Sequence, residues 1–503
     1  MSTALRAIRL RLPAAAGAAA LAACAVGPNF HRPSPPAAAD YGKARSQGTT
    51  AEAPGTGGSA QHLISGMDIP GEWWTLFQSP KLSGLVEQSL KANPNITAAQ
   101  AALRQAHELY KAQRTSFFPL VQGGFDALRA KNAVATIANP TTYAQVNPYY
   151  NLFTAQLNLS YLPDVFGGTR RSLEATRAQV DATRFELIAT YVTLSSNVVT
   201  TAVQEAALRG QIAATERLLE LQHQLTETVK GQKTLGTASD ADLLAQLAAE
   251  AQTAATLPPL NKQLGQTRDA LTALLGRLPS EEPADTFRLE DLTLPTELPV
   301  SLPSKLVEQR PDVRQAEENL HAASAQVGVA VADMLPQFTI SANTGSTALE
   351  ISKLFTAYTG FWDLGASLTQ TLFDAGAMFY RHSAAAAALD QAGAGYRATV
   401  LLACQNVADT LRALQADADA LKATAEADRA ARASFDLARQ QHELGTVSLV
   451  ALLNAEQTYQ QAQIALVQAQ ANRYADTAGL FQALGGGWWN LPGTTLNEQP
   501  RVA

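Results

Sequence analysis

Residues 153–161 read FTAQLNLSY, a stretch in which every second side chain is apolar. One face carries Phe153, Leu157 and Tyr161 with an alanine and another leucine, and the other face carries Thr, Gln, Asn and Ser. A period of two predicts a β-strand. A strand with one aliphatic and aromatic face and one uncharged polar face suits a wall between lipid and a water-filled lumen. This stretch therefore predicts a membrane-spanning strand.

Three other segments show the same alternation, at residues 362–369, 338–342 and, more weakly, 120–125. Four strands are too few for a soluble sandwich with one buried face, and the chain offers no others. Aromatic residues gather near the strand ends, as they do where membrane barrels meet the two interfaces. The residues expected at the interface are Tyr149, Tyr150, Tyr358, Phe361 and Trp362.

Four strands cannot close a barrel, because single-chain barrels need about eight. An open sheet edge is not tolerated in lipid, so the chain must associate with copies of itself. Two copies would give eight strands and an interior filled by side chains, whereas three would give twelve and leave room for a pore. The strands alone permit either number.

Two proline-free stretches, from Pro163 to Pro258 and from Pro336 to Pro492, predict long helices. A helix from about Thr169 to Lys230 would be roughly 90 Å long at ~1.5 Å per residue. Within both stretches apolar residues recur every seven positions, which is coiled-coil spacing. They are Leu173, Val180, Leu187 and Leu194 in the first stretch, and Val400, Cys404, Val407, Leu411, Leu414, Ala418 and Leu421 in the second. Cys404 is accordingly expected in an apolar seam.

The chain contains two copies of one plan: helix, two strands, long helix, tight turn, helix. The paired landmarks are Pro94 with Pro311, Pro119 with Pro336, Gly236 with Gly445, and Gly276 with Gly485. The predicted organisation is a signal peptide (1–23), a lipidated N-terminus, tether and equatorial segment (24–80), a first repeat (81–276), a linker (277–303), a second repeat (304–485) and a tail (486–503). Within it, residues 34–66 are rich in Pro, Ala, Gly, Ser and Thr, which predicts a tether and no packed element.

The N-terminus has the layout of a signal peptide, with three arginines, a short apolar stretch and small residues before Cys24. A cysteine at this position resembles the bacterial lipobox, in which the thiol receives diacylglycerol and becomes the mature N-terminus. Ala25 follows in place of the aspartate that usually retains lipoproteins at the inner membrane, so the resemblance favours outer-membrane sorting.

Composition and motifs exclude several classes of protein. Only 16% of the 503 residues are charged, so something other than a charged surface covers much of the molecule. The net charge of -6, without any basic block, gives no case for nucleic acid. Past residue 30 there is no run of eighteen apolar residues, as a membrane helix would need. No catalytic motif, nucleotide loop or pair of histidines at ligand spacing is present, so no enzyme, cofactor or metal site is predicted.

Four further motifs together resemble the outer-membrane efflux lipoproteins, the TolC-like exit ducts of RND-type tripartite pumps. They are CAVGPNFHRP at 24–33, WWTLF at 73–77, Arg310-Pro311-Asp312 and LGGGW at 484–488, and the likeness spans residues 24–490. The resemblance implies a homotrimer whose twelve-stranded outer-membrane barrel continues into a periplasmic α-helical barrel. It also implies a periplasmic adaptor, an inner-membrane RND transporter and outer-membrane lipids as partners, for a duct that performs no chemistry.

In this family the helix-turn-helix of each repeat closes the periplasmic end, which the resemblance places at residues 235–240 and 444–449. The family often has acids beyond the second turn, but Ala451 and Asn454 stand there, so any acidic ring would depend on Asp240 and Asp242. First-turn stabilisation of a helix is an equally expected role for both aspartates. The residues expected at the aperture are Gly236, Thr237, Asp240, Asp242, Gly445, Thr446 and Asn454.

Two other functions are compatible with these patterns. One is an outer-membrane duct of a type I protein secretion system, against which the lipobox and the terminal LGGGW motif count. The other is a periplasmic coiled-coil lipoprotein that never spans the membrane. The exported substrate cannot be inferred from this chain, because ducts for drugs, aromatic acids, fatty acids and metal ions have similar walls.

Overall fold

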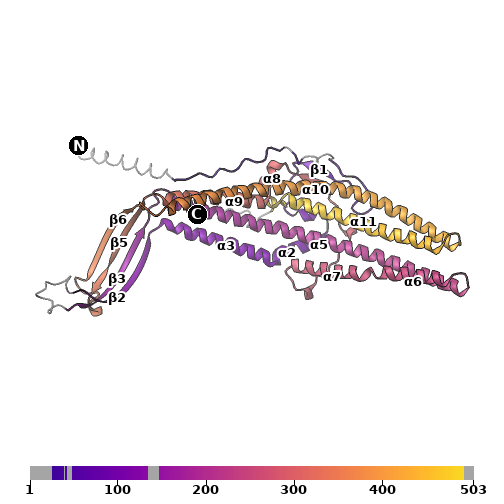
Figure 1. Ribbon diagram of the computed structural model, residues 1–503, viewed down its shortest axis with the longest axis horizontal. Helices are drawn as coiled ribbons and strands as arrows, with labels where there is room; N and C mark the ends of the chain where they lie inside the picture. The colour runs from indigo at the N-terminus through magenta and orange to yellow at the C-terminus, as the bar shows by residue number, and fades with distance from the viewer. Residues whose placement is uncertain (1–24, 39, 42–47, 134–146, 492–503) are drawn as a thin grey trace. The chain divides into compact units, whose positions relative to one another are not determined.

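The computed structural model describes residues 25–38, 40–41, 48–133 and 147–491 (Figure 1). The signal peptide, Cys24 and residues 492–503 of the tail lie outside the described residues. The chain forms two compact units, and each takes segments from both repeats. Unit 1 comprises residues 1–32, 105–181 and 318–394, and unit 2 comprises residues 33–104, 182–317 and 395–503.

Unit 1 contains a four-stranded antiparallel sheet, and all four predicted strands are confirmed. The strands are β2 (Leu120–Lys131), β3 (Tyr149–Tyr161), β5 (Gln337–Ala348) and β6 (Gly360–Thr369). They lie side by side in the order β2-β3-β5-β6 (Figure 1). The central pair therefore joins the last strand of the first repeat to the first strand of the second.

The register of the sheet puts most apolar residues of the four strands on one face, although Leu128 and Leu152 pair with each other on the other. Leu159 pairs with Val121 on one side and with Ala342 on the other, and Ala342 pairs with Leu364. The opposite face is mainly polar. Across it the hydroxyls of Thr154 and Thr347 lie 3.1 Å apart, and Asn343 Nδ2 donates to Asp363 Oδ1 at 3.1 Å. The alternation in each strand thus adds up to one apolar and one polar surface.

Four helices contribute residues to both units. They are α3 (Pro94–Arg114), α5 (Gly168–Thr234), α9 (Pro311–Asp333) and α10 (Ala377–Glu443). The prolines at the first positions of α3 and α9 are tolerated because a first-turn residue needs no N–H partner. An aspartate precedes each long helix and caps it. Asp164 accepts from the N–H of Thr169, and Asp374 accepts from the N–H of Met378. The long helix predicted from Thr169 to Lys230 is confirmed as α5.

Unit 2 is mainly helical. Its other elements are β1 (His62–Ser65), η2 (Trp73–Phe77), α2 (Pro80–Ala92), α6 (Asp240–Ala254), α7 (Leu257–Leu274), η5 (Pro279–Glu281), η6 (Leu289–Asp291), β4 (Glu297–Val300), α8 (Pro303–Gln309), α11 (Leu449–Ala483) and η8 (Trp488–Asn490). The two repeats differ here, because α11 is continuous whereas its counterpart is broken between α6 and α7. Pro258 and Pro259 fall in the first turn of α7, the part of a helix where proline is accepted.

The core of unit 2 combines the predicted seam with an aromatic cluster. Val407, Leu414 and Leu421 of the seven-residue repeat are fully buried, and Cys404 beside them is half-buried. Trp73 is buried as well, and its ring stacks on Phe481 with centroids 5.2 Å apart. Among the described residues, no helix is both long enough and apolar enough to cross a membrane.

The two copies of the plan end in the same kind of contact. In the first, the Asn93 side chain before Pro94 donates to Leu274 O at the end of α7, at 2.8 Å. In the second, the Arg310 guanidinium before Pro311 donates to Ala483 O at the end of α11, at 3.0 Å. In each repeat, therefore, the residue before the first landmark proline contacts the end of the last helix, so the entry and the exit of the repeat meet at one junction.

The tether prediction for residues 34–66 is wrong over residues 48–66. In this range β1 pairs in parallel with β4, and Thr50 and Gln61 are buried. The Arg473 guanidinium of α11 donates to Thr50 Oγ1 at 3.2 Å and to Gln61 Oε1 at 2.9 Å. Polar residues here accept hydrogen bonds from Nη2 of a buried arginine, and a composition rule cannot distinguish such a segment from a solvated linker.

Candidate functional site

Two helical hairpins in unit 2, α5 with α6 and α10 with α11, end in identical turns. Gly236 and Gly445 have φ of 77° and 73°, the left-handed conformation that glycine adopts without strain. The next residues, Thr237 and Thr446, donate their N–H groups to the carbonyls of Gln232 and Gln441, both at 2.9 Å. In each hairpin this hydrogen bond satisfies a carbonyl at the end of the first helix. Ser239 and Ser448 then cap α6 and α11.

The acids expected at the aperture have local partners in the first hairpin. Asp242 Oδ2 accepts from the N–H of Ser239 at 3.0 Å, and Ser239 Oγ accepts from the N–H of Asp242 at 3.2 Å, a reciprocal capping box. The Ser239 hydroxyl, which donates to Asp242 Oδ2 at 2.7 Å, and the Ser239 N–H hold the pKa of Asp242 below its ordinary value. Asp240 forms an ion pair with Lys233 at the end of α5. Both aspartates therefore have the helix-stabilising role that the sequence also allows, and a role at the aperture stays a prediction.

The second hairpin has no acid in its first helical turn. Ser448 Oγ accepts from the N–H of Ala451 at 3.3 Å, so the cap is kept without the reciprocal carboxylate. Asn454 lies one turn further on, and its carbonyl accepts from Thr458 Oγ1 at 2.8 Å. Acids in the first helical turn after the two glycines thus come from the first repeat alone.

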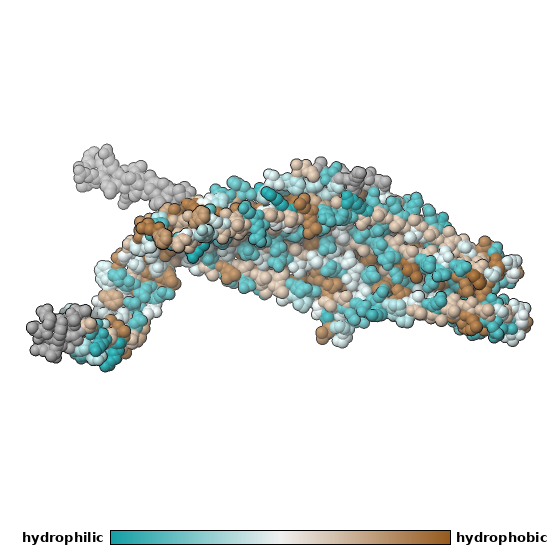
Figure 2. Space-filling model, in the orientation of Figure 1, coloured by the Kyte–Doolittle hydropathy of each residue, from teal (hydrophilic) through white to brown (hydrophobic). Residues whose placement is uncertain are grey.

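Large apolar side chains are exposed beside both turns. Leu235 and Leu444 are 81% and 79% exposed, and Leu244 and Val450 also face solvent. Figure 2 shows hydrophobic residues near the free ends of the hairpins. The geometry of these turns does not require apolar side chains, so exposed leucines beside them indicate a contact surface.

An apolar cluster behind the turns joins the two hairpins. Val229 of α5, Phe435 of α10 and Leu452 of α11 are buried together, and the rings of Phe435 and Tyr459 stack at 5.7 Å. The two hairpins consequently share one core near their ends.

The aromatic residues expected at a membrane interface all lie at one end of the sheet in unit 1. Tyr149 and Tyr150 begin β3, Phe361 and Trp362 lie at the start of β6, and Tyr358 precedes it. These positions lie at the same end of the antiparallel sheet, because Ala348 at the end of β5 pairs with Phe153 near the start of β3. The Lys131 ammonium lies 5.4 Å from the centre of the Tyr149 ring. Their interfacial role remains a prediction.

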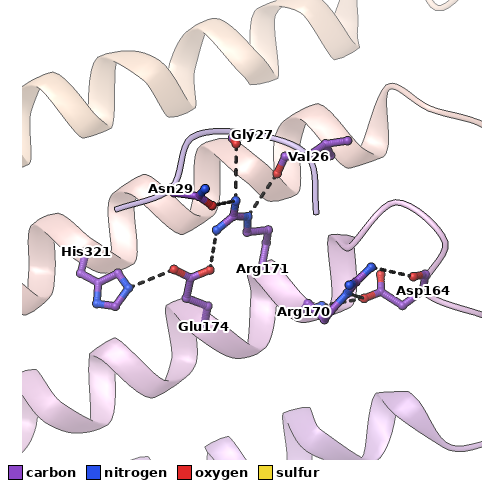
Figure 3. A network of polar contacts seen from close by, with 8 residues as sticks. All are labelled: Val26, Gly27, Asn29, Asp164, Arg170, Arg171, Glu174 and His321. Carbon is purple, nitrogen blue, oxygen red and sulfur yellow. Dashed lines mark hydrogen bonds and ion pairs between the residues drawn. The ribbon is translucent and has the colours of Figure 1, made fainter. Parts of the chain in front are cut away.

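The first described residues, which directly follow Cys24, are held in unit 1 by Arg171 (Figure 3). Arg171 Nε donates to Val26 O at 3.1 Å, and Nη2 donates to Asn29 Oδ1 at 2.6 Å and to Gly27 O at 3.4 Å. Nη1 is paired with Glu174 at 2.7 Å. We call residues 25–30 with Arg171 and Glu174 the N-terminal clamp.

The clamp requires close backbone contact. A Cβ on Gly27 would lie 2.4 Å from the Cα of Gly328 in α9, and one on Gly167 would lie 2.7 Å from the Cα of Ala25. Further along, Phe30 stacks on His321 with ring centroids 4.4 Å apart, and His321 Nε2 lies 3.0 Å from Glu174. The clamp thus links the start of α5, in the first repeat, to α9, in the second.

Sequence reasoning missed Arg171 and two buried polar residues of unit 2, Arg473 and Glu456. Glu456 shares a helix face with Leu449 and Leu452. A carboxyl on that apolar face was the sequence signal that could have identified Glu456 as a buried residue. No group of three or more His, Cys, Asp or Glu side chains suited to a metal ion occurs in the part of the chain that the structure describes.

An open sheet with one apolar and one polar face, together with duplicated helical hairpins, defines a class of membrane duct. Residues 85–277 and 302–486 match the family model of outer membrane efflux proteins, so the chain belongs to this family. It is a TolC-like efflux channel of the outer membrane, a class that is not enzymatic.

Named relatives extend over most of the chain. The pyoverdine export outer membrane protein OpmQ of Pseudomonas putida is 28% identical over 83% of this chain and 88% of its own. The solvent efflux pump outer membrane protein SrpC of Pseudomonas putida is 26% identical over 93% and 96%. Among solved structures, the outer-membrane channel OprN is 28% identical, with a TM-score of 0.82 over 92% of this chain and 100% of its own. The CmeC channel of Campylobacter jejuni, at 21% identity and a TM-score of 0.82, shares the fold.

Proposed function

We propose that the chain is the exit duct of an RND-type tripartite efflux system, a passive channel that takes small molecules from the periplasm and the inner-membrane pump to the exterior. The observation that carries the proposal is the combination of an uncovered four-stranded sheet with two matched hairpins in a member of the efflux family. Relatives named as efflux pump proteins support the pump assignment over protein secretion.

The active form is a homotrimer. Strands β2 and β6 are the two edges of the described sheet, and open edges in lipid leave backbone groups without partners. Three chains would close twelve strands, with the apolar face toward lipid and the polar face toward a lumen wide enough to conduct. Dimers would leave an interior filled by side chains, which does not suit a duct.

The hairpin ends are the aperture and the docking surface for a periplasmic adaptor. The exposed leucines beside Gly236 and Gly445 support docking, because they offer apolar area at an otherwise polar turn. Cys24 is the lipidation site, and the N-terminal clamp, which holds the residues just after it, would keep the acylated end against unit 1. Lipid chains supplement the anchorage of the strands.

Copurification decides which transport system the duct serves. Tagged protein would be cross-linked in native membranes, extracted in detergent and analysed by mass spectrometry, and its native mass would be measured in parallel. An RND transporter, an adaptor and a mass of three copies are expected. An ATP-driven exporter as the dominant partner would instead assign the chain to type I secretion, and a stable folded monomer would contradict the closure of sheet edges.

A further inference from the structure

Three helices in unit 2 enclose a buried carboxyl group and two buried amide side chains. Glu456 of α11, Gln222 of α5 and Gln246 of α6 are 1%, 4% and 0% exposed. Within the described chain, both carboxyl oxygens of Glu456 and the side-chain oxygens of both glutamines have no hydrogen-bond partner. The Gln246 amide nitrogen donates to the Gln222 backbone carbonyl at 3.2 Å, which engages one of its two N–H groups.

Four buried acceptors without a donor are costly, and an ionised carboxylate among them costs more still. The charged neighbours do not relieve the cost. On α5 and α6, His223 and Glu250 pair with each other at 3.1 Å. On α10, Asp428, Arg432 and Asp436 act on Tyr459, and none of these groups acts on the pKa of Glu456. The uncharged Gln222 amide is the neighbour that acts on Glu456, and a proton on Glu456 removes the buried charge and supplies a donor to Gln222 Oε1.

We propose that Glu456 is a proton-operated latch between the hairpins. In its neutral form the carboxyl O–H donates to Gln222 Oε1 and holds α11 against α5 and α6. Loss of the proton leaves a buried negative charge whose neighbours are uncharged amide groups, and the contact between α11 and the first hairpin loosens. The latch lies two turns beyond the start of α11, next to the apolar cluster of Val229, Phe435 and Leu452.

The titration of Glu456 agrees with this arrangement. Burial raises its pKa from 4.5 to about 7, and the neighbouring Gln222 amide opposes only part of the rise. A carboxyl with a raised pKa in the folded state stabilises the packing fully below about 4.5, and this contribution is lost as the pH rises to about 7. If the hairpin ends are the aperture, as proposed above, the duct would loosen in neutral surroundings and tighten in acidic ones.

Hydrogen exchange of the detergent-solubilised assembly tests the latch without reference to transport. The variant Glu456→Gln keeps the shape and cannot ionise, and Glu426→Gln removes an exposed charge from α10 as the matched control. Backbone amides of residues 450–456 should exchange faster in the wild type than in Glu456→Gln. The ratio of the wild-type exchange rate to the Glu456→Gln exchange rate should grow by up to about tenfold per pH unit between pH of about 4.5 and 7, and then level off. The ratio between variants cancels the intrinsic pH dependence of exchange.

Several outcomes would overturn the latch. The wild type and Glu456→Gln could exchange alike at every pH, or Glu426→Gln could show the same effect. Slower exchange of the wild type on adding Ca²⁺ or Mg²⁺ at pH 8 would mean that a cation satisfies the oxygens. If Glu456→Gln does not fold, residues 450–456 are compared with residues 466–470 of α11 in the wild type alone, and an equal pH response at both places would contradict the proposal.

Bilayer recordings separate the latch from the proposed aperture. With the latch and the aperture both correct, wild-type conductance rises from pH 6 to pH 8 and that of Glu456→Gln does not. If exchange responds as expected while conductance is the same in both proteins at both pH values, the latch stands and the assignment of the aperture to the hairpin ends is wrong.

Discussion

Arg171 shows how much one side chain can organise in this chain. Its side chain is only 5% exposed, and three of its hydrogen bonds go to residues 26–29. A buried guanidinium needs nearly all its donors satisfied, so the segment after Cys24 is as necessary to Arg171 as Arg171 is to the segment. Burial would raise the pKa of Glu174, but hydrogen bonds from Arg171 and His321 hold it below its ordinary value.

Replacing Arg171 with Ala should release the N-terminal clamp. We expect a loss of ~2–4 kcal/mol, because several charge-assisted hydrogen bonds disappear and Glu174 stays half-buried. Thermal melting and limited proteolysis near residue 30 measure it. Arg177→Ala, at an exposed position of the same helix, is the control. Equal protease resistance of the two variants would show that other contacts hold the segment.

Asp417 of α10 provides a second test at the residue scale. Burial raises its pKa to about 7, helped by a hydrogen bond and repulsion from Asp476, while Arg473 acts in the opposite direction. The stability that the neutral Asp417 carboxyl contributes is fully present below pH of about 3.8, and it is lost as the pH rises to about 7. Asp417→Asn should therefore flatten part of the fall in melting temperature between pH 5 and 8. The exposed Asp419→Asn should leave the profile of the wild type unchanged.

At the scale of elements, glycines with a left-handed backbone serve two purposes: some allow a tight turn, and others also allow a close backbone contact. A pair of variants distinguishes the two. A Cβ on Gly445 meets no atom within 4 Å, so Gly445→Ala should cost only the backbone term, about 1–2 kcal/mol. A Cβ on Gly487 would lie 2.4 Å from Pro70 O, so Gly487→Ala should cost more than about 3 kcal/mol or prevent folding. Melting temperatures of the two proteins compare them directly. Similar losses would show that the core around Pro70 adapts.

The first hairpin can be tested for a charge ring in the same way. The double variant Asp240→Asn, Asp242→Asn removes the only acids in the first turn of α6. If three copies of each converge at the aperture, single-channel recordings should show a weaker preference for cations, because close carboxylates raise the local cation concentration. The melting temperature should fall slightly as the capping box weakens. Lower stability with unchanged selectivity would make these residues caps alone.

At the scale of the whole molecule, anchorage and assembly should be separable. The intact mass of purified protein should show the loss of residues 1–23 and the addition of lipid at Cys24, since small residues precede a cysteine there. Cys24→Ser should weaken membrane retention without abolishing it, because the strands insert independently. Native mass and membrane flotation measure both effects. An unmodified N-terminus, or one that begins at another residue, would rule out the lipid anchor.

Patterns in the sequence determined the four long strands and the two long helices of this protein. A period of two marked β3, absence of proline with a period of seven marked α5 and α10, and paired landmarks marked the duplication. The two periods are local signals, since each depends on neighbours within a few turns or a few strand residues. The hairpin glycines were found for the same reason, because a left-handed helix end has a short and specific sequence.

Only the tertiary structure decided what the polar residues do. Thr50 and Gln61 look like linker residues until Arg473, more than 400 positions later, is seen to bind them. Arg171 and Glu456 look like ordinary helix residues until their neighbours on other segments are placed around them. The cost or benefit of a polar group depends on its burial and on partners brought together by folding, and neither is encoded near the residue itself.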